Sequence, residues 1–363
     1  MGGDCVIDRV RLHWLRMPVS VVFSYGEVRA FPFVVVRLSA GGAEGVGEAG
    51  VPPTDSFLDF ASTLVGADAR RLDSLLPEMP SDHERILCEG VSIALHDLVG
   101  RLSGLPAHVL LGGAPSDRVA LMPCLFPHNS EEAREAAQRF LAQGYRYLKV
   151  KLAGLLSEDL ARVRAVRSAT DKGITLQGDA NCGYKDLESA RRAVETLGAA
   201  GLDVFEDPLE GPISDYARLR GGPGAKVMVD AHARRTGDLL AVLRAGAADA
   251  IGVHADQPGS LTRALRHVRL AQTFGVPAVI GGTGYCGIGS AAYQHLTAVA
   301  TPDGPCGELG GFFDHGMPKS LVRAPLPMDN GFVTLPRRAA GLGVELDEDA
   351  LREFEEGCKE WRG

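Results

Sequence analysis

The sequence predicts an α/β protein in which a closed βα barrel follows an N-terminal α+β domain. Five polar residues in the middle of the chain each end a short apolar run, namely Lys151, Asp179, Glu206, Asp230 and His254. They are separated by 28, 27, 24 and 24 residues, which matches one strand, its return helix and two loops. In a closed barrel of parallel strands, all five side chains would meet at the carboxyl-terminal face, where the catalytic groups of such barrels lie.

The first part of the chain, residues 1–116, predicts the α+β domain. Residues 5–50 alternate apolar and polar side chains in two or three runs, which is typical of an antiparallel meander. Residues 19–31 are expected to lie between strands, and residues 55–113 to form helices. The clearest of these helices, in CEGVSIALHDLVGRLSG, has one apolar stripe made of Ile93, Leu95, Leu98 and Leu102.

Strands and helices alternate from residue 117 to residue 318, which we take as the barrel. The string VALMPCL predicts the first strand, and SEEAREAAQRFLAQG predicts a helix with an N-cap serine and a glycine stop. Counted from Cys124 through Glu308, the strand ends number eight, enough to close a barrel. Residues 319–363 contain a strand, a Gly-rich turn and a short helix, and we expect them to pack back on the N-terminal domain.

The composition is that of an ordinary globular protein, with 45% hydrophobic and 23% charged residues. A formal charge of −8 gives no reason to expect nucleic acid or an anionic membrane as a partner. The seven cysteines are scattered without a CxxC pair, which is typical of reduced thiols in the cytoplasm. We expect neither a signal peptide nor a membrane span, and therefore a cytoplasmic protein.

Three of the strand-end residues are carboxylates, and they indicate a bound metal ion. Asp179, Glu206 and Asp230 follow adjacent strands, so their side chains can converge. Unpaired, they would repel one another and raise each other's pKa. Three oxygen ligands with open positions for water and substrate suit Mg²⁺. Polar residues after strands often cap the next helix instead, which we expect of Asp186 and Ser260, but three carboxylates in register favour the metal site.

Lys149 and Lys151 form a KxK pair whose alternation puts both side chains at the barrel mouth. A solvated basic strand end is the plainer interpretation, but carboxylates nearby favour a functional pair. A second ammonium and a dication are expected to lower the pKa of Lys151, so that it can act as a base. His254 is a candidate acid/base, although lone histidines are usually structural. Strands two and six lie opposite each other in an eight-stranded ring, so Lys151 and His254 would face one another across a substrate.

These motifs resemble those of the enolase superfamily, and more closely its muconate-lactonizing and mandelate-racemase-like branches. The matching strings are ALHDLVGRLSGLPAHVLLGG, YRYLKVK, GDANCGY, VFEDPLEG and GELGG, together with the strand that ends at Asp230. The resemblance implies an α+β capping domain over a modified TIM barrel of the (β/α)₇β type. It implies Mg²⁺ on Asp179, Glu206 and Asp230, with Lys151 as the acid/base and Lys149 tuning it, because members use a Lys or His base with Mg²⁺ stabilising an ene-diolate.

The resemblance also implies that residues 19–31 are a mobile lid loop that contributes to specificity. Candidate substrate contacts are Tyr25, Arg29, Asn181, His232 and Glu308. His232 either donates a proton or caps the next helix. Members of the family are commonly symmetric oligomers, so the resemblance implies a homo-oligomer that acts on a small-molecule carboxylate.

Two departures from the family pattern bear on the reaction. Members that lactonize, form succinylbenzoate or epimerize dipeptides carry a lysine where this chain has His254, and a glutamate where it has Ala231. Mandelate racemase has its histidine on the seventh strand, but residues 279–288 contain none. The chain therefore fits none of the well-known activities cleanly.

The favoured hypothesis is a Mg²⁺-dependent enzyme that abstracts the proton α to a carboxylate through an enolate intermediate. With bases on both faces, we expect an isomerase, namely a racemase or epimerase of an amino-acid derivative or a hydroxy acid. The alternatives on this scaffold are a dehydratase of acid sugars or hydroxy acids, in which His254 protonates the leaving hydroxyl, and a cycloisomerase. The Asn of GDAN argues mildly against dehydratases that carry histidine there. An alternative of another class is a non-catalytic, metal-binding relative.

Overall fold

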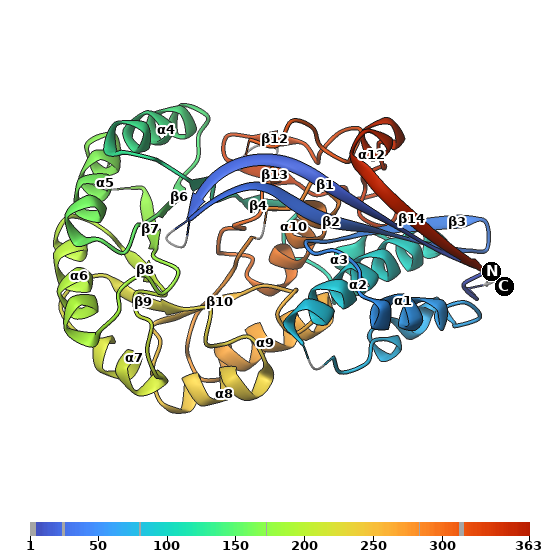
Figure 1. Cartoon of the computed structure of the whole chain (residues 1–363), viewed down its shortest axis with the longest axis horizontal. Coiled ribbons are helices and arrows are strands. Elements are labelled where there is room, and N and C mark those ends of the chain that lie inside the picture. Colours follow the sequence, from blue (N-terminus) through green and yellow to red (C-terminus); the bar gives the residue numbers. More distant parts are fainter. Residues whose placement is uncertain (1–4, 24–25, 80, 172, 283, 312–315) are drawn as a thin grey trace.

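The computed structural model describes most of the chain. The described ranges are 5–23, 26–79, 81–171, 173–282, 284–311 and 316–363. Figure 1 shows two parts side by side, a sheet with its helices and a barrel ringed by helices. Among the described ranges, no helix combines the length and the apolar character that crossing a membrane requires.

A four-stranded antiparallel sheet forms the core of the N-terminal part. In spatial order its strands are β14 (Glu355–Arg362), β1 (Arg9–Phe23), β2 (Gly26–Ala40) and β3 (Ala43–Ala49). The edge strand β14 comes from the other end of the chain and pairs with β1, for example Arg11 with Glu360. The last residues of the chain therefore pack on its first strand. The domain boundaries at 116 and 318 stay a prediction.

Residues 19–23 and 26–31, the described part of the segment 19–31, belong to the paired strands β1 and β2, so their assignment to a loop between strands is wrong. Val21 pairs with Val28, and Phe23 pairs with Gly26. The apolar and β-branched residues of this segment favour continued strand pairing over a long loop. In Figure 1 this end of the hairpin reaches across the barrel toward β6.

One long helix, α2 (Asp82–Ser103), covers the N-terminal sheet. Ser81 caps its first turn, and Gly104, with a φ of 70°, ends it. The predicted single apolar stripe is wrong, because almost every residue from Arg85 to Gly100 is buried. The helix lies between the sheet on one side and barrel helices on the other. The smaller helices of this part are α1 (Asp55–Ser62), the 3₁₀ helix η1 (Ala69–Leu75) and α3 (Ala107–Leu110).

Seven parallel strands, paired in chain order, form the barrel wall. They are β5 (Cys124–Leu125), β6 (Tyr147–Lys151), β7 (Thr175–Asp179), β8 (Val204–Glu206), β9 (Lys226–Val229), β10 (Ala250–Val253) and β11 (Ala278–Ile280). The eighth position is a single residue, Cys306, which forms parallel bridges to Ile280 and to Leu121. These bridges close the ring, and the predicted modified barrel is confirmed.

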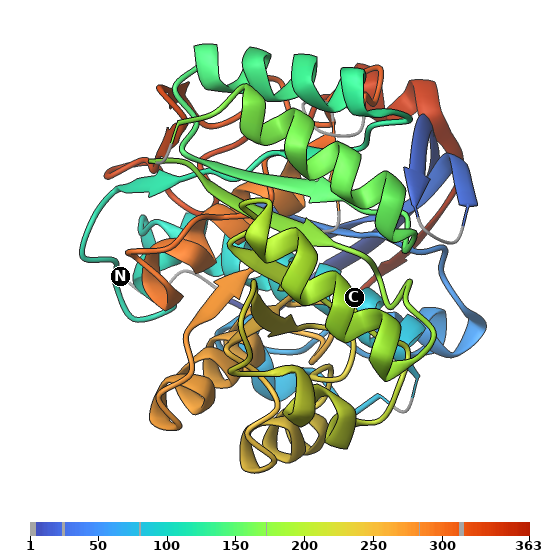
Figure 2. The ribbon, with the colours of Figure 1, turned by 90° about the vertical axis from the view of Figure 1, so that its left-hand side faces the viewer.

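The barrel strands are joined by helices that cover its outer side (Figure 2). These helices are α4 (Ser130–Ala142), α5 (Leu156–Ser168), α6 (Leu187–Ala199), α7 (Ile213–Leu219), α8 (Thr236–Arg244), α9 (Leu261–Thr273) and α10 (Ile288–Ala300). Asn129, not the predicted serine, caps α4. Asp186 and Ser260 cap α6 and α9 as expected. Helix α10 is buried along its whole length, because it packs between the barrel and the helices of the N-terminal part.

A small antiparallel sheet stands beside the barrel. Its strands are β12 (Met328–Asp329), β13 (Phe332–Thr334) and β4 (Arg118–Ala120). The predicted first strand VALMPCL is therefore split, since Val119 belongs to this sheet and Cys124 to the barrel. Pro123, which has no backbone N–H, lies at the break. Helix α12 (Glu348–Phe354) then leads into β14.

The register of the barrel strands sets the level of the polar strand ends. Lys151 of β6 pairs with Asp179 of β7, and Asp179 pairs with Glu206 of β8. Three of the predicted polar residues therefore lie side by side at the carboxyl ends of adjacent strands. This is the arrangement that the spacing of the sequence predicted.

Candidate active site

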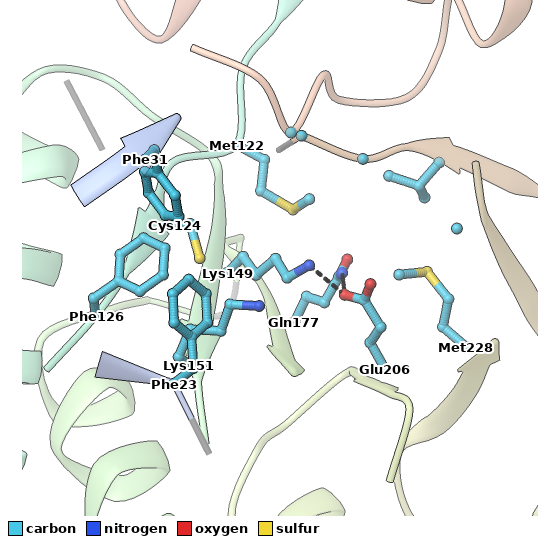
Figure 3. A pocket seen from close by; sticks show the side chains of 15 residues that line it. Phe23, Phe31, Met122, Cys124, Phe126, Lys149, Lys151, Gln177, Glu206 and Met228 are labelled. Atoms are coloured by element: carbon cyan, nitrogen blue, oxygen red, sulfur yellow. Dashed lines mark hydrogen bonds and ion pairs between the residues drawn. The ribbon is translucent and has the colours of Figure 1, made fainter. Parts of the chain in front are cut away.

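Lys149 and Lys151 project from the same side of β6 into one pocket, as alternation on a strand predicts (Figure 3). Lys149 Nζ lies 3.0 Å from Asp179 Oδ2 and 2.5 Å from Glu206 Oε2. Lys151 Nζ donates to Asp179 Oδ2 at 2.5 Å and to the side-chain oxygen of Asn181 at 3.0 Å. The structure therefore brings the lysine pair into direct contact with two of the predicted metal ligands.

The carboxylates around the two lysines favour their charged forms. Burial acts to lower the pKa of Lys151, but the negative charge of Asp179 outweighs it and the pKa is raised. The pKa of Lys149 is raised well above its usual range, because Asp179 and Glu206 together outweigh its burial. Lys149 acts to lower the Lys151 pKa as expected, and the lowering by a bound dication stays a prediction. Part of the carboxylate charge has to be neutralised before Lys151 can act as a base.

The carboxylates of Asp179 and Glu206 are not the unpaired groups that the sequence suggested. Both are buried, and Gln177, on the same face of β7 as Asp179, donates its amide to Glu206 Oε2 at 2.6 Å. Burial, followed by the negative charge of Asp179, raises the pKa of Glu206. Burial also acts to raise the pKa of Asp179, but Lys149 and Lys151 outweigh it and lower that pKa. Additional positive charge would therefore favour the ionised form of Glu206.

Asp230 and His254 lie on the other side of Glu206. One ligand-type atom from each of these three residues lies within 4.8 Å of the other two. His254 Nε2 is 3.7 Å from Asp230 Oδ2, and Gln257 donates its amide to the other oxygen of Asp230. The prediction placed His254 across from Lys151 as an acid/base. The structure also places it beside two carboxylates, where an imidazole can either bind a metal or carry a proton.

Two glycines make room for these side chains. A Cβ atom on Gly281, just after β11, would lie 2.0 Å from His254 Nε2. A Cβ atom on Gly252 of β10 would lie 3.0 Å from the Cβ of Asp230. Any side chain at position 281 would therefore have to displace the imidazole.

The carboxylates fit a divalent cation. Asp179 and Glu206 send oxygens to the same ammonium nitrogen, and Glu206 shares a cluster of ligand atoms with Asp230. After burial, the charges of Asp179 and Asp230 both act to raise the pKa of Glu206, so a cation at this point is favourable. Carboxylate oxygens are the donors that Mg²⁺ takes. Asp179 lies outside the 4.8 Å group, so the full set of three ligands stays a prediction.

A second group of metal-ligating side chains lies on the β1–β14 pair. It consists of His13, Glu355 and Cys358, with His13 Nδ1 2.7 Å from Glu355 Oε1. Burial lowers the pKa of His13 despite Glu355, and Arg37 and Arg11 act in the same direction.

Asp207 is a buried acid beside the site that the sequence analysis overlooked. Its oxygens accept hydrogen bonds from the backbone N–H groups of Asp230 at 3.0 Å and Ala231 at 2.9 Å. It is buried and has a φ of +42°, which is uncommon for a residue other than glycine. Burial and the neighbouring acids raise its pKa well above the usual range. Asp207 thus holds the end of β9, and the string EDP, with a second acid directly after Glu206, was the available signal.

Two of the predicted substrate contacts, Asn181 and His232, each follow one of the carboxylates by two residues. Their side chains make different kinds of contact. Asn181 joins the cluster through its bond to Lys151. His232 Nε2 bonds to the backbone oxygen of Gly211 at 2.7 Å, and its ring packs edge-on against Tyr216. His232 therefore anchors a loop. Neither of its predicted roles, proton donor or helix cap, is what these contacts provide.

The remaining predicted substrate contacts do not join the cluster. Glu308 is buried, and its carboxylate accepts two backbone N–H bonds from the loop after β11, so it is turned toward the chain itself. Arg29 lies on the hairpin with an exposed side chain and pairs with Glu27 at 3.1 Å. Tyr25 lies outside the described residues.

The strand ends open into a cavity of about 190 Å³. Its polar side consists of Lys149, Lys151, Gln177 and Glu206. Its apolar side consists of Phe23, Phe31, Met122, Cys124, Phe126, Met228 and Val279. Figure 3 shows the three phenylalanines grouped beside Lys151, and Met228 beside Glu206. Gly252 and Gly281 complete the lining next to Asp230 and His254.

Comparison with protein families agrees with this geometry. Residues 7–112 match the mandelate racemase/muconate lactonizing enzyme N-terminal domain, and residues 131–350 match the enolase C-terminal domain-like family. D-galactarolactone cycloisomerase of Agrobacterium fabrum is 30% identical over 96% of this chain and 98% of its own length. Muconate cycloisomerase 1 of Rhodococcus opacus is 30% identical over 91% and 92%. N-succinyl-L-Arg/Lys racemase of Bacillus cereus is 23% identical over 96% and 97%.

Solved structures show the same fold. The crystal structure of N-succinyl Arg/Lys racemase from Bacillus cereus matches with a TM-score of 0.89 and 22% identity, covering 98% of this chain and 100% of that one. Muconate lactonizing enzyme from Pseudomonas fluorescens, complexed with muconolactone, matches with a TM-score of 0.88 and 23% identity, covering 97% and 100%.

Proposed function

This chain belongs to the mandelate racemase/muconate lactonizing enzyme family of the enolase superfamily, and from that premise we propose that it is a Mg²⁺-dependent racemase or epimerase. The substrate class is a small carboxylate with a proton on its α-carbon, an amino-acid derivative or a hydroxy acid. The observation that carries the proposal is the pair of proton-carrying groups, Lys151 and His254, at the ends of β6 and β10. The relatives described above are named as a racemase and as cycloisomerases, which supports an isomerase.

The lysine face performs the first half of the reaction. The α C–H bond breaks, Lys151 Nζ takes the proton, and the electron pair spreads onto the substrate carboxylate. The Lys149 ammonium, 2.5 Å from Glu206, faces that growing negative charge. A Mg²⁺ ion held by Asp179, Glu206 and Asp230 would stabilise the same charge as a Lewis acid and offset the pull of Asp179 on the Lys151 proton.

The histidine face performs the second half. His254 delivers a proton to the opposite side of the α-carbon, which inverts the configuration. Gly281, which lines the cavity and lies against the imidazole, leaves the ring room to reach the substrate. In the reverse direction the two residues exchange roles. Solvent restores their starting protonation states.

A second candidate reaction is β-elimination. His254 belongs to the same group of ligand-type atoms as Glu206 and Asp230, so it lies where a hydroxyl leaving from the β-carbon could be protonated. The product would then be a keto acid, and no inverted substrate would form.

Proton NMR in D₂O separates these reactions. The Mg²⁺-loaded protein is incubated with N-acyl amino acids, dipeptides, proline derivatives, hydroxy acids and acid sugars. Loss of an α-proton signal with the skeleton intact is the expected result, and removal of the cation with EDTA should abolish it. A keto-acid signal would show that the reaction is elimination and not racemisation. The absence of both reactions on every substrate would contradict the proposal and leave a metal-binding protein without this activity.

A further inference from the structure

The apolar side of the cavity has a composition that can distinguish between carboxylate substrates. Phe23, Phe31, Phe126, Met122 and Cys124 line it together, and we call these five residues the aromatic subsite. Phe23 and Phe126 pack edge to face with ring centroids 5.5 Å apart. Figure 3 shows the three rings gathered on the side of the pocket that carries Lys151. The rings come from two different parts of the chain, the hairpin end and the segment after β5.

The distance from the subsite to the base fixes which part of a substrate it would touch. The Lys151 Nζ lies 5.3 Å from the ring centroid of Phe23. A proton on the α-carbon has to come within about 3 Å of that nitrogen to be transferred. The substituent on the same carbon is then in van der Waals reach of the Phe23 ring. The carboxylate of such a substrate would then lie toward the ammonium of Lys149.

The charged residues and the volume of the cavity further restrict which substituents it can bind. Among the described residues that line the cavity, the charged ones are Lys149, Lys151 and Glu206, and each is already within 3.0 Å of an opposite charge. A charged substituent placed against the rings would lose its hydration without gaining a partner. The whole cavity measures about 190 Å³, against roughly 150 Å³ for an apolar cavity that holds benzene, so it limits the substituent to about the size of one ring.

We propose that the aromatic subsite binds an uncharged, phenyl-sized or branched aliphatic substituent on the α-carbon of the substrate. This inference rests on the proposed function, which places the α-carbon at Lys151. It goes further because it excludes acid sugars and acidic or basic amino-acid derivatives as good substrates. Specificity then lies in the hairpin end and in Phe126, while the chemistry lies in the barrel.

Binding of unreactive analogues tests the subsite without requiring catalysis. The probes are N-formyl-α-methylphenylalanine and N-formyl-α-methylaspartate, neither of which has an α-proton, titrated calorimetrically into the Mg²⁺-loaded protein. The phenyl analogue should bind at least about tenfold more tightly, because burial of a ring-sized apolar group is worth more than one such factor. Equal binding, tighter binding of the aspartate analogue, or binding of neither at millimolar concentration would overturn the inference.

Two variants assign the effect to the subsite. Phe31→Ala should weaken the phenyl analogue about tenfold and leave the aspartate analogue unchanged. Phe274→Ala, which removes an exposed ring remote from the cavity, is the matched control and should change neither. Phe126→Arg should reverse the preference, because it gives the acidic substituent a partner. An unchanged preference in both cavity variants, with the native fold shown by circular dichroism, would also overturn the subsite.

Solvent exchange distinguishes a failure of this inference from a failure of the proposed function. If α-protons of acidic or basic substrates exchange as fast as those of phenylalanine and leucine derivatives, the subsite is wrong and the proton abstraction stands. If no α-proton exchanges but the phenyl analogue still binds more tightly, the subsite stands and the proposed reaction is wrong.

Discussion

The two residues proposed to carry protons, Lys151 on what we call the lysine face and His254 on the histidine face, are held in place by different means. On the lysine face, Lys151 contacts Asp179 at 2.5 Å and Asn181 at 3.0 Å, so its position is fixed by charge and hydrogen bonds. On the histidine face, His254 lies 3.7 Å from Asp230, and its space exists because position 281 has no side chain. One face is therefore organised by charge, and the other by shape.

This difference has a practical consequence for mutagenesis. A change of charge should be felt on the lysine face, where every ammonium is matched by a carboxylate. A change of volume should be felt on the histidine face, where one methyl group fills the space of a ring atom.

Gly281→Ala should have the largest effect on the proposed role of His254. Its Cβ would lie 2.0 Å from His254 Nε2, so the imidazole has to turn away while the fold remains. The rate of α-proton exchange should fall about 10²-fold or more, which is the scale of general acid–base catalysis, with little change in Mg²⁺ affinity. Exchange followed by NMR, with calorimetry for Mg²⁺, measures both.

The control for this variant is Gly237→Ala in α8. No atom lies within 4 Å of the position that its Cβ would take, so neither activity nor Mg²⁺ affinity should change. An active Gly281→Ala enzyme would show that the imidazole at this position is not needed. It would contradict the claim that the space at position 281 positions His254 for catalysis.

Asp207→Asn should weaken cation binding without touching the cation. Both oxygens of Asp207 accept backbone N–H groups at the end of β9, and an amide nitrogen cannot accept either bond. Asp230 then loses its fixed position, and Mg²⁺ affinity should fall about 10-fold or more, as for other residues that orient metal ligands. Calorimetric titration of Mg²⁺ measures this. Unchanged affinity would mean either that other contacts hold Asp230 in place or that Mg²⁺ binding does not need Asp230.

Much of the lysine face could be predicted from the sequence, because its geometry is local. Alternation along β6 places Lys149 with Lys151, and equal βα spacing places Asp179 and Glu206 beside them. The contact of Lys151 with Asp179, which raises the Lys151 pKa in the absence of a cation, depends on side-chain positions that spacing does not give. The other misses are long-range contacts, which no local pattern contains.

The hairpin and the histidine face show the same limit. Residues 19–31 carry no strong turn signal other than Gly26, so the full length of β1 and β2 became clear only from their pairing. The fit of His254 against Gly281 joins two strands that are separated by a helix. The eighth barrel strand is the single residue Cys306, which a spacing rule can only place approximately.

Stability at low pH gives the smallest and most general effect, and it has to be separated from loss of catalysis. Burial lowers the pKa of His295 to about 3 and that of His267 to about 4. In the unfolded chain both titrate near 6.5, so below that pH the unfolded state binds more protons and folding stability falls. Each histidine should remove about 1 kcal/mol per pH unit between about pH 6 and its folded pKa.

Urea unfolding at pH 7.5, 6 and 5 checks this expectation. His295→Gln should flatten the profile, although it also loses packing against His108, with which its ring stacks at 5.1 Å. A free energy of unfolding that does not change over this range would mean that these histidines have the same pKa in the folded and the unfolded chain. If activity is lost at a higher pH than stability, the loss is caused by titration of groups in the cavity and not by unfolding.

The division into two faces is tested most directly by measuring α-proton exchange separately for each substrate enantiomer in D₂O, with Lys151→Met and His254→Asn compared side by side. Each variant is loaded with Mg²⁺, and its fold is checked by circular dichroism. We expect Lys151→Met to lose exchange of one enantiomer by about 10³-fold and to keep the other, and His254→Asn to show the reverse, with Mg²⁺ affinity unchanged. Loss of both enantiomers together with Mg²⁺ affinity in His254→Asn would make His254 a metal ligand and would contradict the two-base mechanism.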